Sequence, residues 1–253
     1  DWSSDVCSSD LLGQLKTATK SNEITAIPEL LQLLELKGCI VTLDAMGCQR
    51  KIAQEIIRKK ADYLLAVKGN QGKLADAFDN WYSPAMWTGE KYESYSTQEK
   101  DHGRLETRLC IASHDLTPLG DLVYDDWPGP ELKTIGIVAT IRQENGEAFD
   151  PKNFVLRYYI SSAELSAKAL LESTRAHWSI ESQLHWRLDV AFREDECQIT
   201  RGEAGENLAV CRHIAINLLT ADKSFKAGIK RKQKRAGRNN EYLSQILAGC
   251  GAS

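Results

Sequence analysis

The sequence lacks the features that define several common classes of protein. Its purely apolar runs are short, the clearest being residues 135–139, whereas a membrane-spanning helix needs about 18 or more apolar residues. It contains no P-loop, no glycine-rich dinucleotide motif and no nucleophile elbow, so the usual signals of NTPases, Rossmann-type enzymes and serine hydrolases are missing. The sequence therefore predicts no membrane span and none of these sites.

Paired cysteines are also missing. The chain has seven cysteines, and none stands in a C-x-x-C pair or at the spacing of zinc ligands. Unpaired thiols are typical of proteins in a reducing compartment. We therefore expect a cytoplasmic protein.

The composition is that of an ordinary globular protein. The chain has 253 residues, of which 42% are hydrophobic and 26% are charged. This length is sufficient for one large domain or two small ones, each with a buried core. The balance of apolar and charged residues argues against a disordered or fibrous chain.

The first eleven residues, DWSSDVCSSDL, differ in character from the rest. They resemble one reading frame of a common short-read sequencing adapter, and we exclude residues 1–11 as an artefact. We then expect the natural start of the protein to be missing. The net charge of −3 becomes zero without the three aspartates of this segment.

Helical and strand patterns alternate in the first third of the chain. A weak strand pattern over residues 12–17 precedes a helical pattern over 26–36, a β-branched strand over 39–43, an amphipathic helix over 49–60 and an apolar strand over 63–67. Such an order is typical of parallel strands joined by crossover helices. We therefore predict an α/β fold.

The rest of the chain divides by composition. Strand-like runs over residues 105–112, 134–142 and 154–160 are separated by Gly, Pro, Asn and Asp, which predicts an antiparallel β insertion or extension. Helical periodicity returns over residues 162–190, 205–220 and 242–247. We divide the chain into an artefact (1–11), a first core part (12–90), a β-rich insertion (91–161), a second core part (162–222) and a basic C-terminal segment (223–253).

Asp44 is the first candidate for chemistry. It follows a predicted central parallel strand, and the carboxyl ends of such strands form the edge where α/β sheets place their sites. Small or flexible residues follow it and leave the carboxylate accessible. The alternative is an acidic residue that interacts with the dipole of the next helix.

A second candidate group lies on the predicted helix over residues 162–190. His177, Glu181 and His185 are four residues apart, so they lie along one side of a helix. Two histidines and a glutamate are compatible with a zinc site. The alternatives are a magnesium site built from carboxylates alone, or a structural ion pair of Glu181 with Arg175 or Arg187.

Basic residues are concentrated near the C-terminus. Residues 223–238 contain eight lysines and arginines and no acidic residue. This pattern favours contact with a polyanion, although a solvated connecting segment has the same composition. The densest part is residues 230–234.

Several motifs together resemble the transposases of the ISAs-one family of insertion sequences, which includes the H-repeat-associated proteins. They are KSNEITAIPELL (20–31), TLDAMGCQ (42–49), KGNQ (68–71), DHGR (101–104), HWSIE (177–181), LDV (188–190) and FRED (192–195). The resemblance covers nearly the whole chain after residue 11.

The resemblance implies an RNase H-like catalytic core of the Asp-Asp-Glu class with a β-rich insertion before the glutamate. In this class three carboxylates hold two divalent cations about 3.5 to 4 Å apart, which activate a water or a DNA 3′-hydroxyl and stabilise the leaving oxygen. Mg²⁺ suits such oxygen ligands, and Mn²⁺ can replace it. The expected chemistry is DNA strand cleavage followed by strand transfer.

The resemblance also assigns residues to roles. It places Asp44 as the second aspartate and Glu181 as the glutamate, both catalytic and metal-binding. The first aspartate, usually in an Asp-Gly pair, has no counterpart, so we expect no strand transfer from the chain as printed. His177 stands where related families have an arginine, which suggests a phosphate contact.

The implied partners are transposon-end DNA, target DNA and a second copy of the chain, with no membrane. We expect DNA at the Glu181 helix and at the basic run, through His177, Arg187, Lys230, Arg231, Lys232, Lys234 and Arg235. The alternatives are a nuclease of the same fold that cuts without joining, and a non-catalytic DNA-binding remnant of a decayed element.

Overall fold

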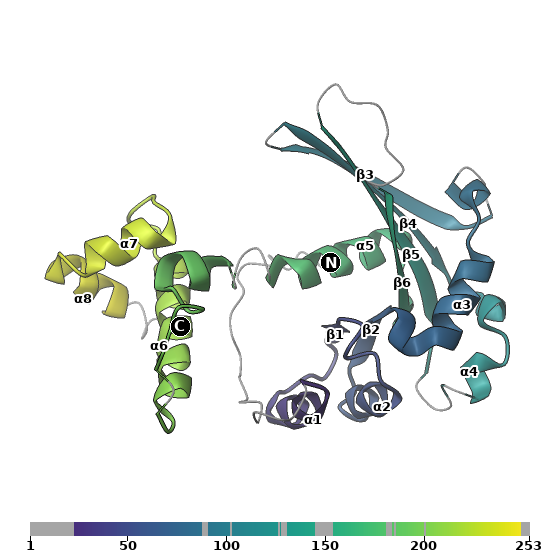
Figure 1. Ribbon diagram of the computed structural model, residues 1–253, viewed down its shortest axis with the longest axis horizontal. Helices are drawn as coiled ribbons and strands as arrows, with labels where there is room; N and C mark the ends of the chain where they lie inside the picture. The colour runs from purple at the N-terminus through teal and green to yellow at the C-terminus, as the bar shows by residue number, and fades with distance from the viewer. Residues whose placement is uncertain are drawn as a thin grey trace. The chain divides into compact units, whose positions relative to one another are not determined.

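The protein is described by a computed structural model (Figure 1). The described residues are 23–87, 91–101, 103–125, 127, 131–144, 154–180, 184, 186–199 and 201–248. They form two compact units, one ending at His177 and the other beginning at Trp178. The strand predicted over residues 12–17 lies outside the described residues.

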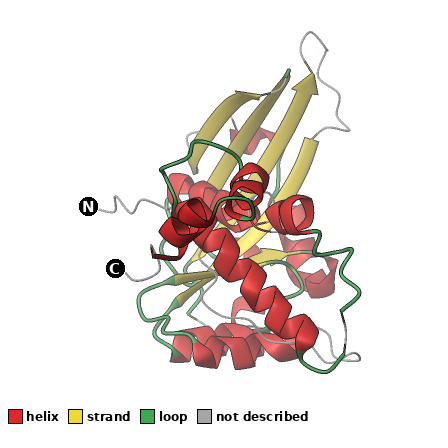
Figure 2. Cartoon of the chain, turned by 90° about the vertical axis from the view of Figure 1, so that its left-hand side faces the viewer, coloured by secondary structure: helices red, strands yellow, loops and turns green. Residues whose placement is uncertain are grey.

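The first unit is built on one six-stranded sheet with the order β1-β2-β6-β5-β4-β3, whose strands are seen side by side in Figure 2. β1 and β2 are parallel, and every other neighbouring pair is antiparallel. The strands are β1 (Ile40–Leu43), β2 (Asp62–Val67), β3 (Glu93–Asp101), β4 (Arg104–Ser113), β5 (Thr134–Glu144) and β6 (Phe154–Ser161).

The first two strands confirm the predicted parallel pair with a crossover helix. α2 (Arg50–Arg58) connects β1 to β2, and it buries Ile52 and Ile56 completely or nearly so. Gly38, at φ +76°, makes the turn between α1 and β1, a conformation that side chains with a Cβ rarely adopt. One expectation is wrong: within the described sheet β1 is an edge strand, not a central one.

Helices cover both faces of the sheet. α1 (Glu23–Leu33), α2 and α3 (Gly72–Trp81) pack on one face, where Tyr63 and Leu65 of β2 point. α5 (Ala167–Ile180) packs on the other face against Leu64 and Ala66. The alternation follows from the two-residue period of a strand. A short helix, α4 (Leu122–Asp125), follows β4.

A glycine in β5 lets α5 lie close to the sheet. A Cβ at Gly136 would overlap the Leu170 side chain and would come within 3.2 Å of the Ile111 carbonyl oxygen. Leu170 itself is completely buried. The height of α5 above the sheet therefore depends on the missing side chain at position 136.

The second unit is helical. It contains a π-helical stretch (Leu188–Phe192), α6 (Ala204–Ala221), α7 (Ile229–Ala236) and α8 (Asn240–Ala248). Of the helix predicted over residues 162–190, the structure describes α5 up to Ile180 and a π-helical stretch over Leu188–Phe192. Two small apolar clusters hold the unit, one around Leu188 and Ile216 and one around Leu219, Tyr242 and Ile246.

None of the helices in the described ranges combines the length and the hydropathy that crossing a membrane requires. The described cysteines carry free thiols: Cys39, Cys48, Cys110, Cys197 and Cys211. Burial raises the pKa of both the Cys48 and the Cys110 thiols to about 12, so these two remain protonated at neutral pH.

Candidate active site and nucleic-acid interface

Asp44 lies directly after the C-terminal end of β1 and is exposed. Its Oδ1 accepts hydrogen bonds from the backbone N–H groups of Met46 at 3.1 Å and Gly47 at 3.2 Å, the pattern by which aspartate stabilises a turn. Within the described part of the chain, no hydrogen bond or ion pair involves Oδ2. One carboxylate oxygen is thus fixed by the loop and the other is available to a ligand.

The loop after Asp44 is held from the end of the neighbouring strand. β1 and β2 are parallel, so the turn after β2, Gly69–Gln71, lies at the same edge as Asp44. The side-chain amide of Asn70 donates to the carbonyl of Ala45. The amide of Gln71 donates to the carbonyl of Cys48 at 2.8 Å.

These bonds give the KGNQ motif a local role that the sequence did not reveal. Its two amide side chains take up backbone carbonyls that have no partner in a strand or helix, so the loop keeps one conformation. Gly47 lies close to β1, since a Cβ there would come within 2.9 Å of the Leu43 Cβ. The loop TLDAMGCQ is therefore closely packed where it follows Asp44.

The last turn of α5 reaches β1. His177 Nδ1 and Thr42 Oγ1 share a hydrogen bond at 3.1 Å. Thr42 lies two residues before Asp44, and His177 lies four residues before Glu181. The structure thus brings the start of the HWSIE motif to the strand that ends at Asp44.

Two further contacts fix α5 on the sheet. Glu93 of β3 accepts a hydrogen bond from the backbone N–H of Ala167 at 3.0 Å, in the first turn of α5. Arg175 pairs with Glu99 of the same strand at 2.6 Å. Of the two arginines that we considered as structural partners of Glu181, Arg175 is therefore engaged with Glu99, and the pairing with Arg187 stays a prediction.

Glu181 and His185 lie outside the described residues. The zinc site on His177, Glu181 and His185 therefore stays a prediction. Among the residues that the structure describes, no three or more His, Cys, Asp or Glu side chains gather as metal ligands. Asp44 fits a hard divalent cation in chemistry and exposure, because carboxylate oxygen is the preferred donor for such ions.

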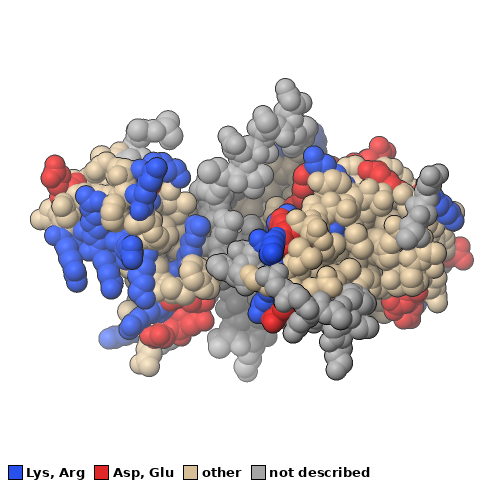
Figure 3. Space-filling model, turned by 90° about the horizontal axis from the view of Figure 1, so that it is seen from above, with Lys and Arg blue, Asp and Glu red and all other residues tan. Residues whose placement is uncertain are grey.

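The basic run forms a helix with a cationic outer face. Ile229 and Ala236 of α7 pack against the cluster of Leu219 and Tyr242. The exposed residues of the same helix include Lys230, Arg231, Lys234 and Arg235. Figure 3 shows lysine and arginine side chains gathered on the surface of the helical unit. We name these four residues the basic face of α7.

Arg235 differs from the other members of this face. Its guanidinium lies 4.4 Å from the ring centroid of Phe225 and 4.6 Å from that of Tyr242. Such cation–π contacts hold the guanidinium in place. Arg235 therefore helps to pack α7 on α8 as well as contributing charge.

Lys232 corrects one sequence prediction. We expected it to bind DNA, but it is 6% exposed. Its ammonium donates to the carbonyls of Leu219 at 2.8 Å and of Asp222, and lies 3.5 Å from the Asp222 carboxylate. Because its charge is used inside the protein, Lys232 is a structural residue of the α6–α7 connection and is not available to a phosphate.

Asp222 is the centre of this buried polar group. The pKa of its carboxyl is held well below the usual range. The largest cause is the hydrogen bond from the Ser224 hydroxyl, and the Tyr242 hydroxyl and the Lys232 charge add to it. Burial and the Asp222 contact raise the pKa of Tyr242 to about 12. At neutral pH, therefore, an ionised Asp222 connects α6, α7 and α8.

Comparison with known proteins identifies the family. The model of the transposase DDE domain matches residues 5–218. This chain belongs to that family of transposases. Domains of this family use divalent metal ions in DNA transposition.

Curated relatives support the same assignment. The chain is 46% identical to "H repeat-associated putative transposase YhhI" of Escherichia coli K12 over 243 residues, which is 96% of this chain and 64% of the relative. It is 48% identical to "Putative transposase YncI" of Escherichia coli O157:H7 over 240 residues, 95% of this chain and 60% of the relative.

A third relative, "Putative protein YbfL" of Escherichia coli K12, is 47% identical over 243 residues, which is 96% of this chain and 64% of the relative. The chain thus spans 60 to 64% of the length of these three relatives. The resemblance to H-repeat-associated transposases is confirmed.

Proposed function

We propose that this chain is part of a transposase that cuts and joins the DNA of an insertion sequence by metal-dependent phosphoryl transfer. Asp44 and Glu181 are two of the carboxylates that would hold the metal ions. The observation that carries this proposal is the Thr42–His177 hydrogen bond, because it joins the strand that ends at Asp44 to the helix that leads to Glu181.

The fold supports this assignment. We propose that β1, α2 and β2 belong to an RNase H-like core, since a parallel pair with a crossover helix precedes α5, whose last residue comes directly before Glu181 in the sequence. The strands β3–β6 then correspond to the β-rich segment before that helix. The exposed position of Asp44 at the end of β1 is where such a core needs a metal ligand.

The chain's own residues have defined tasks in this mechanism. Mg²⁺, or Mn²⁺ in its place, would activate the attacking oxygen and stabilise the leaving oxygen of the scissile phosphate. Asp44 supplies an oxygen ligand from a loop that Asn70 and Gln71 hold rigid. We propose that His177, which shares a hydrogen bond with Thr42, contacts a phosphate of the DNA.

The set of carboxylates is incomplete in the printed sequence. It contains no Asp-Gly pair, the form in which this class usually has its first aspartate. We propose that the chain as printed does not transfer strands by itself. A magnesium-dependent nicking assay on the purified 253-residue chain should show no turnover, and efficient turnover would contradict this part of the proposal.

Metal binding tests the two assigned ligands without catalysis. We expect Mn²⁺ titrations followed by electron paramagnetic resonance to show weaker binding in the Asp44→Asn and Glu181→Gln variants. Asp121→Asn and Glu196→Gln are matched controls, because both side chains are exposed and lie outside the proposed site. Equal binding by all four variants would remove Asp44 and Glu181 as metal ligands.

The basic face of α7, with Arg187, is the proposed DNA-binding surface of the helical unit, and His177 is a separate proposed contact on the first unit. Its exposed lysines would displace counterions from the phosphate backbone, so binding falls as salt rises. We expect Lys230→Glu with Lys234→Glu to weaken binding of transposon-end DNA. Lys37→Glu is the control, since exposed Lys37 precedes β1, at the opposite end of the strand from Asp44.

Two transposon ends are processed together in this class, so we propose a homo-oligomer as the active form. We also propose that it acts in the cytoplasm, where free thiols stay reduced. On a longer chain that also supplies the first aspartate, a strand-transfer assay separates this proposal from a nuclease that only cuts. In that longer chain, loss of activity with Glu181→Gln while DNA binding persists separates it from a non-catalytic remnant.

A further inference from the structure

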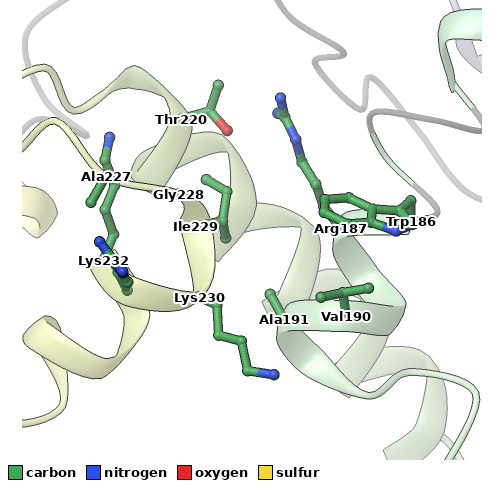
Figure 4. A pocket seen from close by; sticks show the side chains of 11 residues that line it. Trp186, Arg187, Val190, Ala191, Thr220, Ala227, Gly228, Ile229, Lys230 and Lys232 are labelled. Atoms are coloured by element: carbon green, nitrogen blue, oxygen red, sulfur yellow. The ribbon is translucent and has the colours of Figure 1, made fainter. Parts of the chain in front are cut away.

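A pocket in the second unit lies beside the basic face of α7. Its volume is about 520 Å³, within the range of roughly 300–1,000 Å³ that is typical of ligand sites. Figure 4 shows that its walls come from the π-helical stretch on one side and from the start of α7 on the other. The residues used below are Trp186, Arg187, Val190, Ile229, Lys230 and Arg231.

The pocket combines an aromatic surface with apolar walls. Trp186 lines the pocket and is 60% exposed, whereas the average tryptophan in a protein is largely buried. Val190 and Ile229 add aliphatic surface beside it. A flat ligand that covers the indole would remove a large apolar area from water, so the site favours a planar ring.

The same pocket carries uncompensated positive charge. Arg187, Lys230 and Arg231 contribute to its lining, and in the described ranges no ion pair neutralises any of the three. The pocket also includes Gly228, which precedes the first turn of α7. The N-terminal end of a helix adds to the attraction for an anion.

A planar ring and an anion next to each other are the two parts of a nucleotide. We propose that this pocket holds one unstacked nucleotide of the bound DNA, with its base against Trp186 and its phosphate near Arg187, Lys230 and Arg231. The inference rests on the proposed DNA-binding function and adds a specific subsite to it. A fully paired duplex keeps its bases inside the stack, so only a base outside the stack reaches Trp186.

The charge around the pocket favours DNA over a free nucleotide. Lys234 lies one helical turn beyond Lys230 on the same side of α7. It extends the cationic surface beyond the pocket and matches the phosphates of neighbouring nucleotides. A mononucleotide would use only the pocket, whereas a strand would use the whole basic face.

Binding of three DNA probes to the 253-residue chain tests this inference. The probes are a paired duplex, the same duplex with one bulged 2-aminopurine, and a single strand that contains 2-aminopurine. We expect tighter binding of the bulged duplex than of the paired duplex, and quenching of the 2-aminopurine fluorescence by Trp186. Equal affinity with no quenching would overturn the inference.

Variants at position 186 separate stacking from general binding. Trp186→Leu should reduce affinity for the bulged duplex roughly 5- to 150-fold, the range for removing one base–aromatic stack. Its affinity for the paired duplex should not change. Trp186→Phe should retain most of the preference, because it keeps an aromatic face. Circular dichroism should show that both variants remain folded, since the side chain is largely exposed.

The results also separate this inference from the proposed function. Paired-duplex binding without any preference for the bulge would retain the DNA-binding surface and reject the nucleotide pocket. No binding of any probe would reject both. Thymidine monophosphate that competes as strongly as the bulged duplex would assign the pocket to free nucleotides and would overturn the inference as stated.

Discussion

Thr42 of β1 and His177 of α5 share a hydrogen bond at 3.1 Å although 135 residues separate them in sequence. Each is close in sequence to one of the two carboxylates proposed as metal ligands. The bond involves side chains on two different layers of the first unit. It therefore couples the position of α5 to that of the strand that ends at Asp44.

We expect Thr42→Val to destabilise the first unit by about 1–3 kcal/mol, because the part-buried imidazole loses a partner. The measurement is denaturant unfolding, with hydrogen exchange at the last turn of α5. Thr97→Val is the matched control, since the buried Thr97 hydroxyl has no hydrogen-bond partner within the described structure. Equal losses in both variants would contradict the role of the Thr42–His177 bond.

We expect Asn70→Ala and Gln71→Ala to loosen the loop after Asp44. Each removes a donor to a loop carbonyl, at a cost of roughly 1 kcal/mol for each bond. Faster hydrogen exchange at the Met46 and Gly47 amides, which donate to Asp44, would report the change. Gln98→Ala removes an exposed amide on β3, and it should leave these two amides unchanged.

We expect Lys232→Met to reduce the stability of the helical unit and Lys230→Met to change DNA binding instead. Lys232→Met leaves the Asp222 carboxylate without its cation, so unfolding of the helical unit should become easier by roughly 3–5 kcal/mol. Lys230 is exposed, so Lys230→Met should change stability by less than about 0.5 kcal/mol. It should instead reduce the salt dependence of DNA binding by a slope of about 1. Equal stability of the two variants would contradict the structural role of Lys232.

We expect acid to weaken the helical unit through Asp222. In the folded protein the pKa of this carboxyl lies below the value of about 3.9 in an unfolded chain, chiefly because the Ser224 hydroxyl donates a hydrogen bond to it. Its contribution to stability is therefore complete above about pH 4 to 5 and is lost as the pH falls through the lower folded-state pKa. Thermal unfolding between pH 7 and pH 2 measures this loss. Asp222→Asn should be less stable at pH 7 and should lack this part of the acid dependence.

Much of the first unit could be predicted from local sequence patterns. The apolar and β-branched runs correctly predicted β1, β2 and β4–β6, because most side chains of these strands are buried or half-buried in the sheet. β3 was missed because its sequence, ESYSTQEKD, is polar along its length. Such a strand exists because it pairs with β4 at the edge of the sheet, which no local pattern shows.

The site was predictable only in part for a related reason. Asp44 could be found because it follows a recognisable strand. The roles of Asn70 and Gln71 could not, because their partner carbonyls are 25 and 23 residues away. α7 has no continuous apolar stripe, since Lys232 occupies an inward position. A count of charges does not distinguish this buried lysine from its exposed neighbours, and for that reason we predicted that Lys232 binds DNA.

The missing side chain at Gly136 has a wider effect than its size suggests. Leu170 occupies the space above it, and α5 continues from Leu170 to His177 two turns later. An added methyl group at position 136 would overlap the Leu170 side chain. Because Leu170 is completely buried, it would have to shift, and with it α5, the helix that carries His177 to its hydrogen bond with Thr42.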